Sequence, residues 1–164
     1  MPDYRRNRVP GGTYFFTVNL LDRRTDLLVR HIDALRGAIA QTTQAMPFHI
    51  DAWVVLPEHM RCIWTLPAGD ADYAGRMKLL KTLFSKAVPK TEALTAVRAA
   101  KGERGIWQRR FWEHTLRNDA DCGAHGLRAL YPVKHGYAAT VAEWPHSTFH
   151  RCVARGLYAL DWAG

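Results

Sequence analysis

The sequence lacks the features of a membrane protein and of a secreted one. None of its apolar runs approaches the ~18–20 residues that a helix needs to cross a bilayer. Residues 1–6 contain no apolar stretch of the kind a secretory signal requires. Cysteine is scarce: Cys62, Cys122 and Cys152 are odd in number and too far apart for a disulfide framework or a CxxC metal site. We therefore expect a protein of the reducing cytoplasm with no membrane partner.

Acidic residues are also few. The chain has 15 Asp and Glu against 23 Lys and Arg, a formal net charge of +8. The excess is concentrated between Arg76 and Arg117, where eleven basic residues stand against three acidic ones, and a second cluster opens the chain at 5–8. Concentrated positive charge favours a polyanion, because binding releases counterions. The alternative is a solvated basic face without a nucleic-acid partner.

What the chain does have is enough apolar material for one core. Hydrophobic residues make up 48% of its 164 residues, so a globular domain is expected rather than a disordered chain. We expect residues 1–164 to form a single domain with a short N-terminal arm and an irregular C-terminal tail.

The spacing of the apolar residues predicts the secondary structure. Alternation predicts strands over 13–20, 48–56, 59–66 and about 105–116, and helical spacing predicts helices over about 31–46, 72–88 and 119–131. Residues 90–104 fit a loop or a short exposed helix. The first six elements follow the split βαβ order of a ferredoxin-like sheet. We therefore predict an α+β fold: an antiparallel sheet with its helices on one face, then a third helix and the C-terminal tail.

Segments 48–56 and 59–66 are predicted to be the two arms of a hairpin at the centre of this sheet. In the second arm Met60, Cys62 and Trp64 share an apolar face that should meet the helices, and His59 and Arg61 lie on the other face. In the first arm, strict alternation separates two sets, which are Phe48, Ile50, Ala52, Val54 and Leu56 on one face and His49, Asp51, Trp53 and Val55 on the other.

Six blocks of the sequence, taken together and in order, resemble the REP-associated tyrosine transposases, single-tyrosine relatives of the HUH (His-hydrophobic-His) nucleases. The blocks are 4–6 (YRR), 11–19 (GGTYFFTVN), 54–59 (VVLPEH), 105–114 (GIWQRRFWEH), 132–136 (PVKHG) and 161–164 (DWAG). The resemblance covers nearly the whole chain. It implies a transposase that acts on single-stranded or hairpin DNA of the REP type.

The resemblance also implies a reaction. Two histidines at positions i and i+2 of a strand point to one face and can hold a single Mg²⁺ or Mn²⁺, which polarises the scissile phosphate. A tyrosine on a later helix attacks this phosphate and forms a 5′-phosphotyrosine. An asparagine one helical turn further on also faces the metal.

This chain departs from the family pattern at each of these positions. His59 is the candidate metal ligand, with an ordinary polar residue at the start of a strand as the alternative. The second histidine position is Arg61, whose protonated guanidinium has no lone pair for a metal. Tyr131 stands at the asparagine position, and the nucleophile position falls on Leu127 or Arg128. Tyr131 is thus the candidate catalytic residue, with a packing role as the alternative.

The candidate DNA-binding residues are basic and lie in the charged regions of the matching blocks; they are Arg5, Arg6, Lys78, Lys81, Arg109, Arg110 and Lys134. Each of them could instead solvate the surface. Trp107, Phe111 and Trp112 alternate with basic residues, so they could stack bases or belong to a buried strand.

Two functions follow from these residues. One is an active transposase that cuts and rejoins single-stranded DNA at REP-type hairpins. The other is a catalytically inactive copy that only binds structured single-stranded DNA, and a decayed copy without a role is a third. A monomer and a homodimer both remain open.

Overall fold

The computed structural model describes residues 5–118, 120, 132–156 and 158–162 of the chain. The predicted helix over 119–131 lies outside the described residues, except for residue 120.

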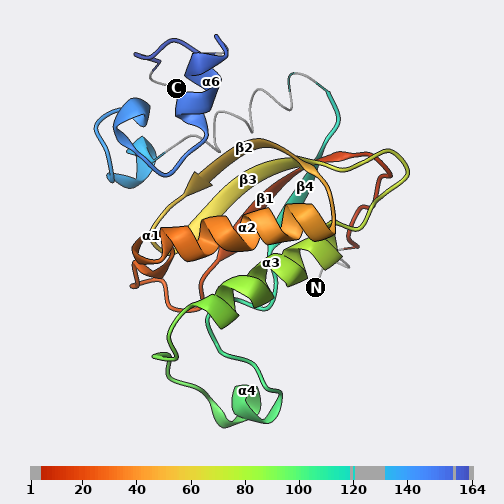
Figure 1. Ribbon diagram of the computed structural model, residues 1–164, viewed down its shortest axis with the longest axis vertical. Coiled ribbons are helices and arrows are strands. Elements are labelled where there is room, and N and C mark those ends of the chain that lie inside the picture. The colour runs from red at the N-terminus through yellow and green to blue at the C-terminus, as the bar shows by residue number, and fades with distance from the viewer. Residues whose placement is uncertain (1–4, 119, 121–131, 157, 163–164) are drawn as a thin grey trace.

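A four-stranded antiparallel sheet forms the centre of the fold (Figure 1). Its strands are β1 (Thr13–Asn19), β2 (His49–Val55), β3 (His59–Thr65) and β4 (Trp112–Leu116), in the order β2-β3-β1-β4. The long helices α2 (Ile32–Ala45) and α3 (Tyr73–Ala87) pack against one face of the sheet. The predicted α+β fold with its ferredoxin-like order is therefore confirmed.

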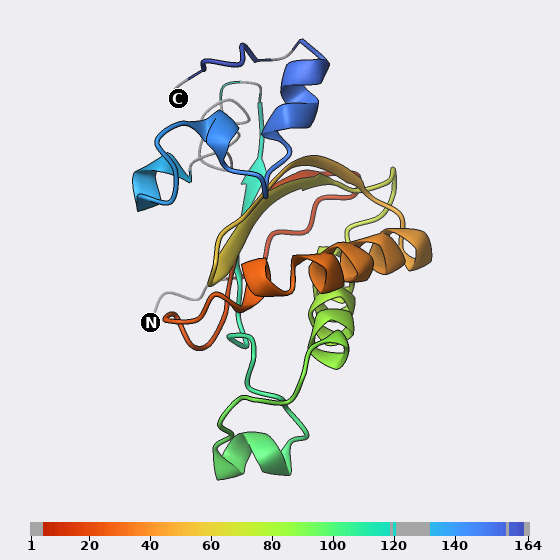
Figure 2. The same ribbon diagram turned by 60° about the vertical axis from the view of Figure 1, so that its left-hand side comes forward.

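Short helical pieces complete the described chain. They are α1 (Leu27–Arg30), α4 (Ala96–Ala100), α6 (Phe149–Ala154) and the 3₁₀ turns η1 (Val133–His135) and η2 (Val141–Glu143). The last three lie on the opposite side of the sheet from α2 and α3 (Figure 2). This tail therefore faces the surface of the sheet that the long helices leave open.

The central position predicted for the hairpin is right for β3 and wrong for β2. Strand β3 lies between β2 and β1, whereas β2 is an edge strand. The tail covers part of this edge: Val55 N–H donates to the His146 carbonyl, and Thr148 N–H donates to the Trp53 carbonyl, each at 2.8 Å. These bonds satisfy backbone groups that an edge strand otherwise leaves unpaired.

A β-bulge in β2 overturns the strict alternation predicted for this strand. The register with β3 shifts between Ile50 and Ala52. Trp53 and Val55 therefore lie in the main core with Ile50, while Ala52 joins a smaller cluster on the other face. One extra residue in a strand inverts the facing of every residue after it.

The core lies between the sheet and the two long helices. Met60, Cys62 and Trp64 of β3 are fully buried in it, as their alternation predicted. The Trp64 ring packs 4.8 Å from that of Phe16 and 4.4 Å from that of Phe48. Helix α3 begins after Asp72, whose carboxylate accepts a hydrogen bond from Gly75 N–H and so caps the helix.

The strand predicted over 105–116 is divided. Only Trp112–Leu116 forms a regular strand, β4, while Trp107 makes a single bridge to Leu20 beyond the end of β1. Gln108 N–H also donates to the Asn19 carbonyl at 3.0 Å. Residues 106–108 are thereby fixed beside the end of β1.

Residues 89–105, which contain the exposed helix α4, form an excursion that protrudes from the body of the protein (Figure 1). Arg104 closes this excursion: its guanidinium pairs with Glu92 and donates to the carbonyls of Ser85, Val88 and Pro89. No helix among the described residues is long and apolar enough to cross a membrane.

A buried arginine joins the two long helices. Arg76 of α3 is 2% exposed. It pairs with Asp70 at 2.7 Å and donates to the carbonyls of Met46 and Pro47, which follow α2. We predict that Arg76→Ala lowers the free energy of unfolding by about 3 kcal/mol or more, because it leaves buried acceptors without donors.

Urea denaturation followed by tryptophan fluorescence measures this loss. Arg36→Ala is the control, since Arg36 pairs with Asp33 on the exposed surface of α2 and should change stability by less than about 0.5 kcal/mol. Equal stability of the two variants would contradict the role assigned to Arg76.

Candidate functional site

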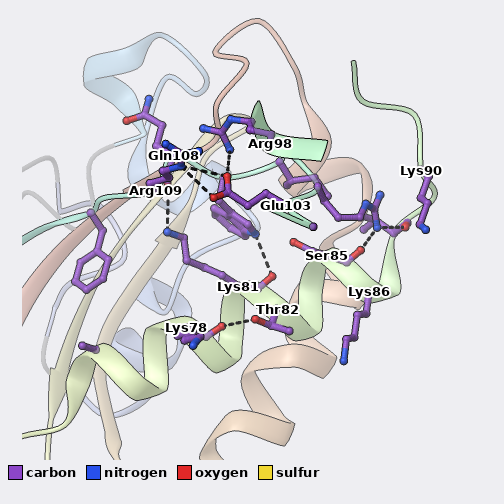
Figure 3. A pocket seen from close by; sticks show the side chains of 18 of the residues that line it. Lys78, Lys81, Thr82, Ser85, Lys86, Lys90, Arg98, Glu103, Gln108 and Arg109 are labelled. Atoms are coloured by element: carbon purple, nitrogen blue, oxygen red, sulfur yellow. Dashed lines mark hydrogen bonds and ion pairs between the residues drawn. The ribbon is translucent and has the colours of Figure 1, made fainter. Parts of the chain in front are cut away.

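A basic cleft lies between α3 and the excursion, on the helix side of the protein (Figure 3). It has a volume of about 1050 Å³. Nine basic side chains line it, against one acidic side chain among the described residues, Glu103; the nine are Arg6, Arg8, Lys78, Lys81, Lys86, Lys90, Arg98, Arg104 and Arg109. The arrangement suits a ligand with several negative charges.

These cations differ in what they already contact. Arg98 and Arg109 both pair with Glu103 at 3.1 Å, as Figure 3 shows. Lys78, Lys86 and Lys90, by contrast, form no ion pair with any acidic residue in the described part of the chain. The lysines along α3 and just beyond it are thus the cations most available to a ligand.

Lys81 occupies the inner wall of the cleft. Its ammonium group donates to the Gln108 carbonyl at 2.8 Å and lies 5.7 Å from the centre of the Phe111 ring. The Arg6 guanidinium covers the same ring at 4.2 Å. Burial, and to a lesser degree the charge of Arg6, lowers the pKa of Lys81 to about 8. Lys81 is therefore mostly charged at pH 7 and loses its charge in mildly alkaline solution.

The aromatic residues near the cleft are mainly structural. Trp107 is 7% exposed, and its indole N–H donates to the Lys81 carbonyl at 3.2 Å, so it belongs to the core. Phe111 lies beneath Arg6. Trp112 lies on the other face of the sheet, against Phe15. Trp107 is therefore a buried residue, which was the alternative to base stacking. The three aromatic side chains do not form a continuous surface on which bases could stack.

The structure divides the predicted DNA-binding residues between several places. Arg6, Lys78, Lys81 and Arg109 line the cleft. Arg5 and Arg110 are exposed but are not among its lining residues, and Lys134 lies beyond the sheet in η1. The charge of these residues in the sequence did not show which of them line the cleft.

A second cluster surrounds His59, on the open face of the sheet. His59 begins β3, pairs with Asn19 of β1 and is 2% exposed. Its Nδ1 lies 2.8 Å from Oε1 of Glu58. The ring of His135, from η1, packs edge-to-face against that of His59 with 5.1 Å between centres. The cluster thus joins the hairpin turn to the tail.

Glu58 fixes the orientation of His59. The same carboxylate accepts hydrogen bonds from Arg23 at 3.3 Å and from the Tyr137 hydroxyl at 3.2 Å. Because a carboxylate only accepts, Nδ1 of His59 carries the proton and Nε2 keeps its lone pair. Glu58, Arg23 and Tyr137 were not among the predicted site residues. Only the position of Glu58 next to His59 could have indicated one of them.

The pKa values of both imidazoles are lowered. Burial lowers the pKa of His59 to about 4. The hydrogen bond and the charge of Glu58 act in the opposite direction, and the charge of Arg61 also lowers the pKa. Partial burial and then Arg61 also lower the pKa of His135. Arg61 lies two residues along β3, on the same face as His59, as the sequence predicted. Its charge therefore acts on both rings.

The described residues do not fit Mg²⁺ or Mn²⁺. They contain no group of three His, Cys, Asp or Glu side chains placed to hold a metal ion. His59 offers one lone pair, the Glu58 carboxylate already accepts three hydrogen bonds, and Arg61 brings a positive charge. Tyr131, Leu127 and Arg128 lie outside the described residues, so the identity of the nucleophile stays a sequence-based prediction.

The electrostatic reach of Arg61 is testable. Arg61→Gln removes a positive charge that opposes protonation, so we predict that it raises the pKa of both His59 and His135. The measurement is an NMR titration of the imidazole C–H signals. Arg36→Ala is the matched control, because Arg36 lowers the pKa of His146 instead. Unchanged titration of His59 and His135 in Arg61→Gln would place Arg61 outside the cluster.

The sequence of this chain was compared with those of known proteins. No model of a protein family matched it. It is 50% identical over 166 aligned residues to the REP-associated tyrosine transposase of Escherichia coli K12, covering all of this chain and 92% of the relative. A Haemophilus influenzae relative with the same family name is 44% identical, with coverage of 100% and 94%.

A solved structure supports the same relationship. It is that of a REP-associated tyrosine transposase bound to a REP hairpin, with a TM-score of 0.86 and 50% identity over all of this chain and 92% of that one. The alignment with this relative covers the whole of the present chain. The chain therefore belongs to the family of REP-associated tyrosine transposases.

Proposed function

We propose that this protein binds REP-type hairpin DNA, with its phosphates held in the basic cleft. The observation that carries the proposal is the lining of the cleft, in which nine basic side chains stand against one acidic side chain. A relative with half of its residues identical has been solved with a REP hairpin bound. Residues 1–164 would act as one domain, in the cytoplasm, where the chromosome is accessible.

The geometry also supports a path from the cleft to the His59 cluster. Gln108 accepts a hydrogen bond from Lys81 in the cleft, and its N–H donates to the Asn19 carbonyl. Asn19 in turn pairs with His59 across β1 and β3. The cleft and the His59 cluster therefore both adjoin the end of β1, the cleft on the helix side of the sheet and His59 on its open face.

We further propose that this protein binds hairpin DNA but does not cleave it. The family reaction needs a tyrosine nucleophile and a divalent metal, Mg²⁺ or Mn²⁺. Here the sequence puts Leu127 or Arg128 at the nucleophile position, and Arg61 replaces the second histidine. The donors among the described residues do not fit a divalent metal.

DNA binding by this protein should depend on the salt concentration. Affinity for a REP hairpin should fall steeply as salt rises, and replacing Lys78 and Lys81 by Ala should flatten the slope of log K against log salt by about 0.7–0.9 for each phosphate contact removed. Fluorescence anisotropy between low and physiological salt measures the slope.

Two controls accompany this measurement. Lys78→Ala is tested alone, because Lys81 also supports the Gln108 backbone and its loss affects folding. Arg36→Ala removes one charge from the exposed surface of α2, outside the cleft, and should leave the slope unchanged. A slope unaffected by both lysine variants would exclude this cleft as the DNA interface.

We also predict that this protein does not form the covalent DNA intermediate of the family reaction. Incubation with REP hairpin DNA and Mn²⁺ should give no covalent protein–DNA adduct on a denaturing gel, with the Escherichia coli relative run beside it as the reference. Arg61→His alone should not restore an adduct, because it adds a metal ligand but no nucleophile. If the unmodified protein forms an adduct that Tyr131→Phe abolishes, then Tyr131 is the nucleophile and the proposed loss of cleavage is wrong.

A further inference from the structure

We propose that Arg98 and Arg109 form a phosphate subsite in the basic cleft, and that the carboxylate of Glu103 occupies this subsite until a phosphate group displaces it. Glu103 is the one acidic side chain that the described residues contribute to the lining of the cleft. In assigning the phosphate to hairpin DNA, the inference rests on the proposed function. The subsite itself can be tested with an inorganic phosphate compound and without DNA.

The two arginines share one carboxylate, as Figure 3 shows. Nε of Arg109 lies 3.1 Å from Oε1 and 3.2 Å from Oε2 of Glu103, and Nη1 of Arg98 lies 3.1 Å from Oε2. Both carboxylate oxygens therefore accept charge-assisted hydrogen bonds. A phosphodiester also presents two oxygens that share one negative charge, and guanidinium groups bind carboxylates and phosphates with the same planar set of donors. The Glu103 carboxylate thus lies where a phosphate can be bound.

The backbone around Glu103 is held in place, so only its side chain has to move. Glu103 N–H donates to the Arg98 carbonyl at 2.9 Å, in the turn that follows α4. The next residue, Arg104, pairs with Glu92 and donates to carbonyls at the end of α3 and just beyond it. Displacement of the carboxylate therefore needs rotation about side-chain bonds, which is fast in exposed residues, and no opening of the excursion.

Solvent exposure makes this exchange of anions possible. The side chains of Arg109 and Glu103 are 48% and 30% exposed, so water screens their ion pair and the pair contributes little to stability. The Arg98 side chain is more buried, at 15% exposed. When the carboxylate leaves, two positive charges lose their shared partner, and a phosphate group replaces it.

The subsite adjoins the inner wall of the cleft. Lys81 donates to the carbonyl of Gln108, the residue before Arg109, at 2.8 Å. Lys81, Gln108, Arg109 and Glu103 all line the same cleft. A polyanion that contacts Lys81 therefore lies next to the two arginines, and Glu103 competes with it for them.

The first experiment is a double-mutant cycle on the affinity for a REP hairpin, measured by fluorescence anisotropy. Glu103→Gln removes the competing charge and should raise the affinity about threefold or more. In the Arg109→Gln background this gain should be clearly smaller, because one of the two arginines that Glu103 releases is absent. An equal gain in both backgrounds would show that Glu103 acts only by long-range repulsion, and the proposal would be wrong.

Asp33→Asn is the matched control for this cycle. It also removes one carboxylate that pairs with an arginine, but it does so on the exposed surface of α2, outside the cleft. Salt screens a charge at such a distance, so the hairpin affinity should not change. A gain as large as that of Glu103→Gln would contradict a specific role for Glu103.

The second experiment needs no variant and no DNA. Inorganic pyrophosphate is added to the full-length protein, and NMR follows the Arg109 Nε–H signal and the side-chain carboxylate carbon of Glu103. Both signals should shift to saturation with one midpoint, because the arginine gains a phosphate as the carboxylate loses its partners. Glu103→Gln should lower the midpoint of the Arg109 shift about threefold or more. An Arg109 signal that shifts while the Glu103 signal stays fixed would overturn the displacement, as would the absence of any shift.

The two experiments separate this proposal from the proposed function. If no hairpin binds while pyrophosphate displaces Glu103, the proposed function fails and the phosphate subsite stands. If Lys78→Ala weakens hairpin binding but the cycle between Glu103 and Arg109 shows no coupling, the cleft stands as the DNA interface and the displacement of Glu103 by DNA fails.

Discussion

The carboxylate of Glu58 is the interaction on which the His59 cluster depends. Burial would raise the pKa of Glu58, but hydrogen bonds from His59 and Arg23 outweigh this effect and lower the pKa, so the carboxylate stays ionised. One oxygen holds His59 and Arg23, and the other holds Tyr137. A residue in the hairpin turn thereby fixes the imidazole on β3, a loop after β1 and the tail at once.

The backbone of the same turn gives this carboxylate a fixed position. Leu20 N–H donates to the Glu58 carbonyl at 2.9 Å, and Leu28 N–H donates to the Pro57 carbonyl at 3.2 Å. The turn between β2 and β3 is therefore joined to the segment that follows β1. The fixed backbone on both sides of Glu58 explains how this buried turn residue can orient the His59 side chain, which is 2% exposed.

Residue patterns predicted the order of the elements and the buried face of β3, because that strand alternates strictly and has polar residues on its open face. They failed in β2, where the bulge reverses which residues face the helices. Ala52 and Val54, on the open face, are also apolar, so the sequence shows no change of pattern at the bulge. The His59–Arg61 pair was predictable from i, i+2 spacing alone. Tyr137 was not, since it reaches Glu58 from 79 residues away, and no local pattern encodes such a contact.

Charge in the sequence does not by itself show which basic side chains are available to a ligand. Of the basic residues in 76–117, Arg76 is buried between the two long helices and Arg104 closes the excursion, so both serve the fold. What remains available is the row of lysines on α3 and after it, together with Arg6 from the N-terminal arm. A local excess of positive charge therefore locates a polyanion site, but burial and ion pairing decide which cations can use it.

The two sites are built from different parts of the chain, and this separates binding from chemistry. Helix α3, the excursion and the N-terminal arm form the cleft, whereas the hairpin turn, β3 and the tail form the His59 cluster. A change at Arg61 alters the charge of the cluster and touches none of the residues that line the cleft. The lining of the cleft is thus independent of the residue at position 61, so the charges of the cleft and those of the His59 cluster can be changed separately by substitution.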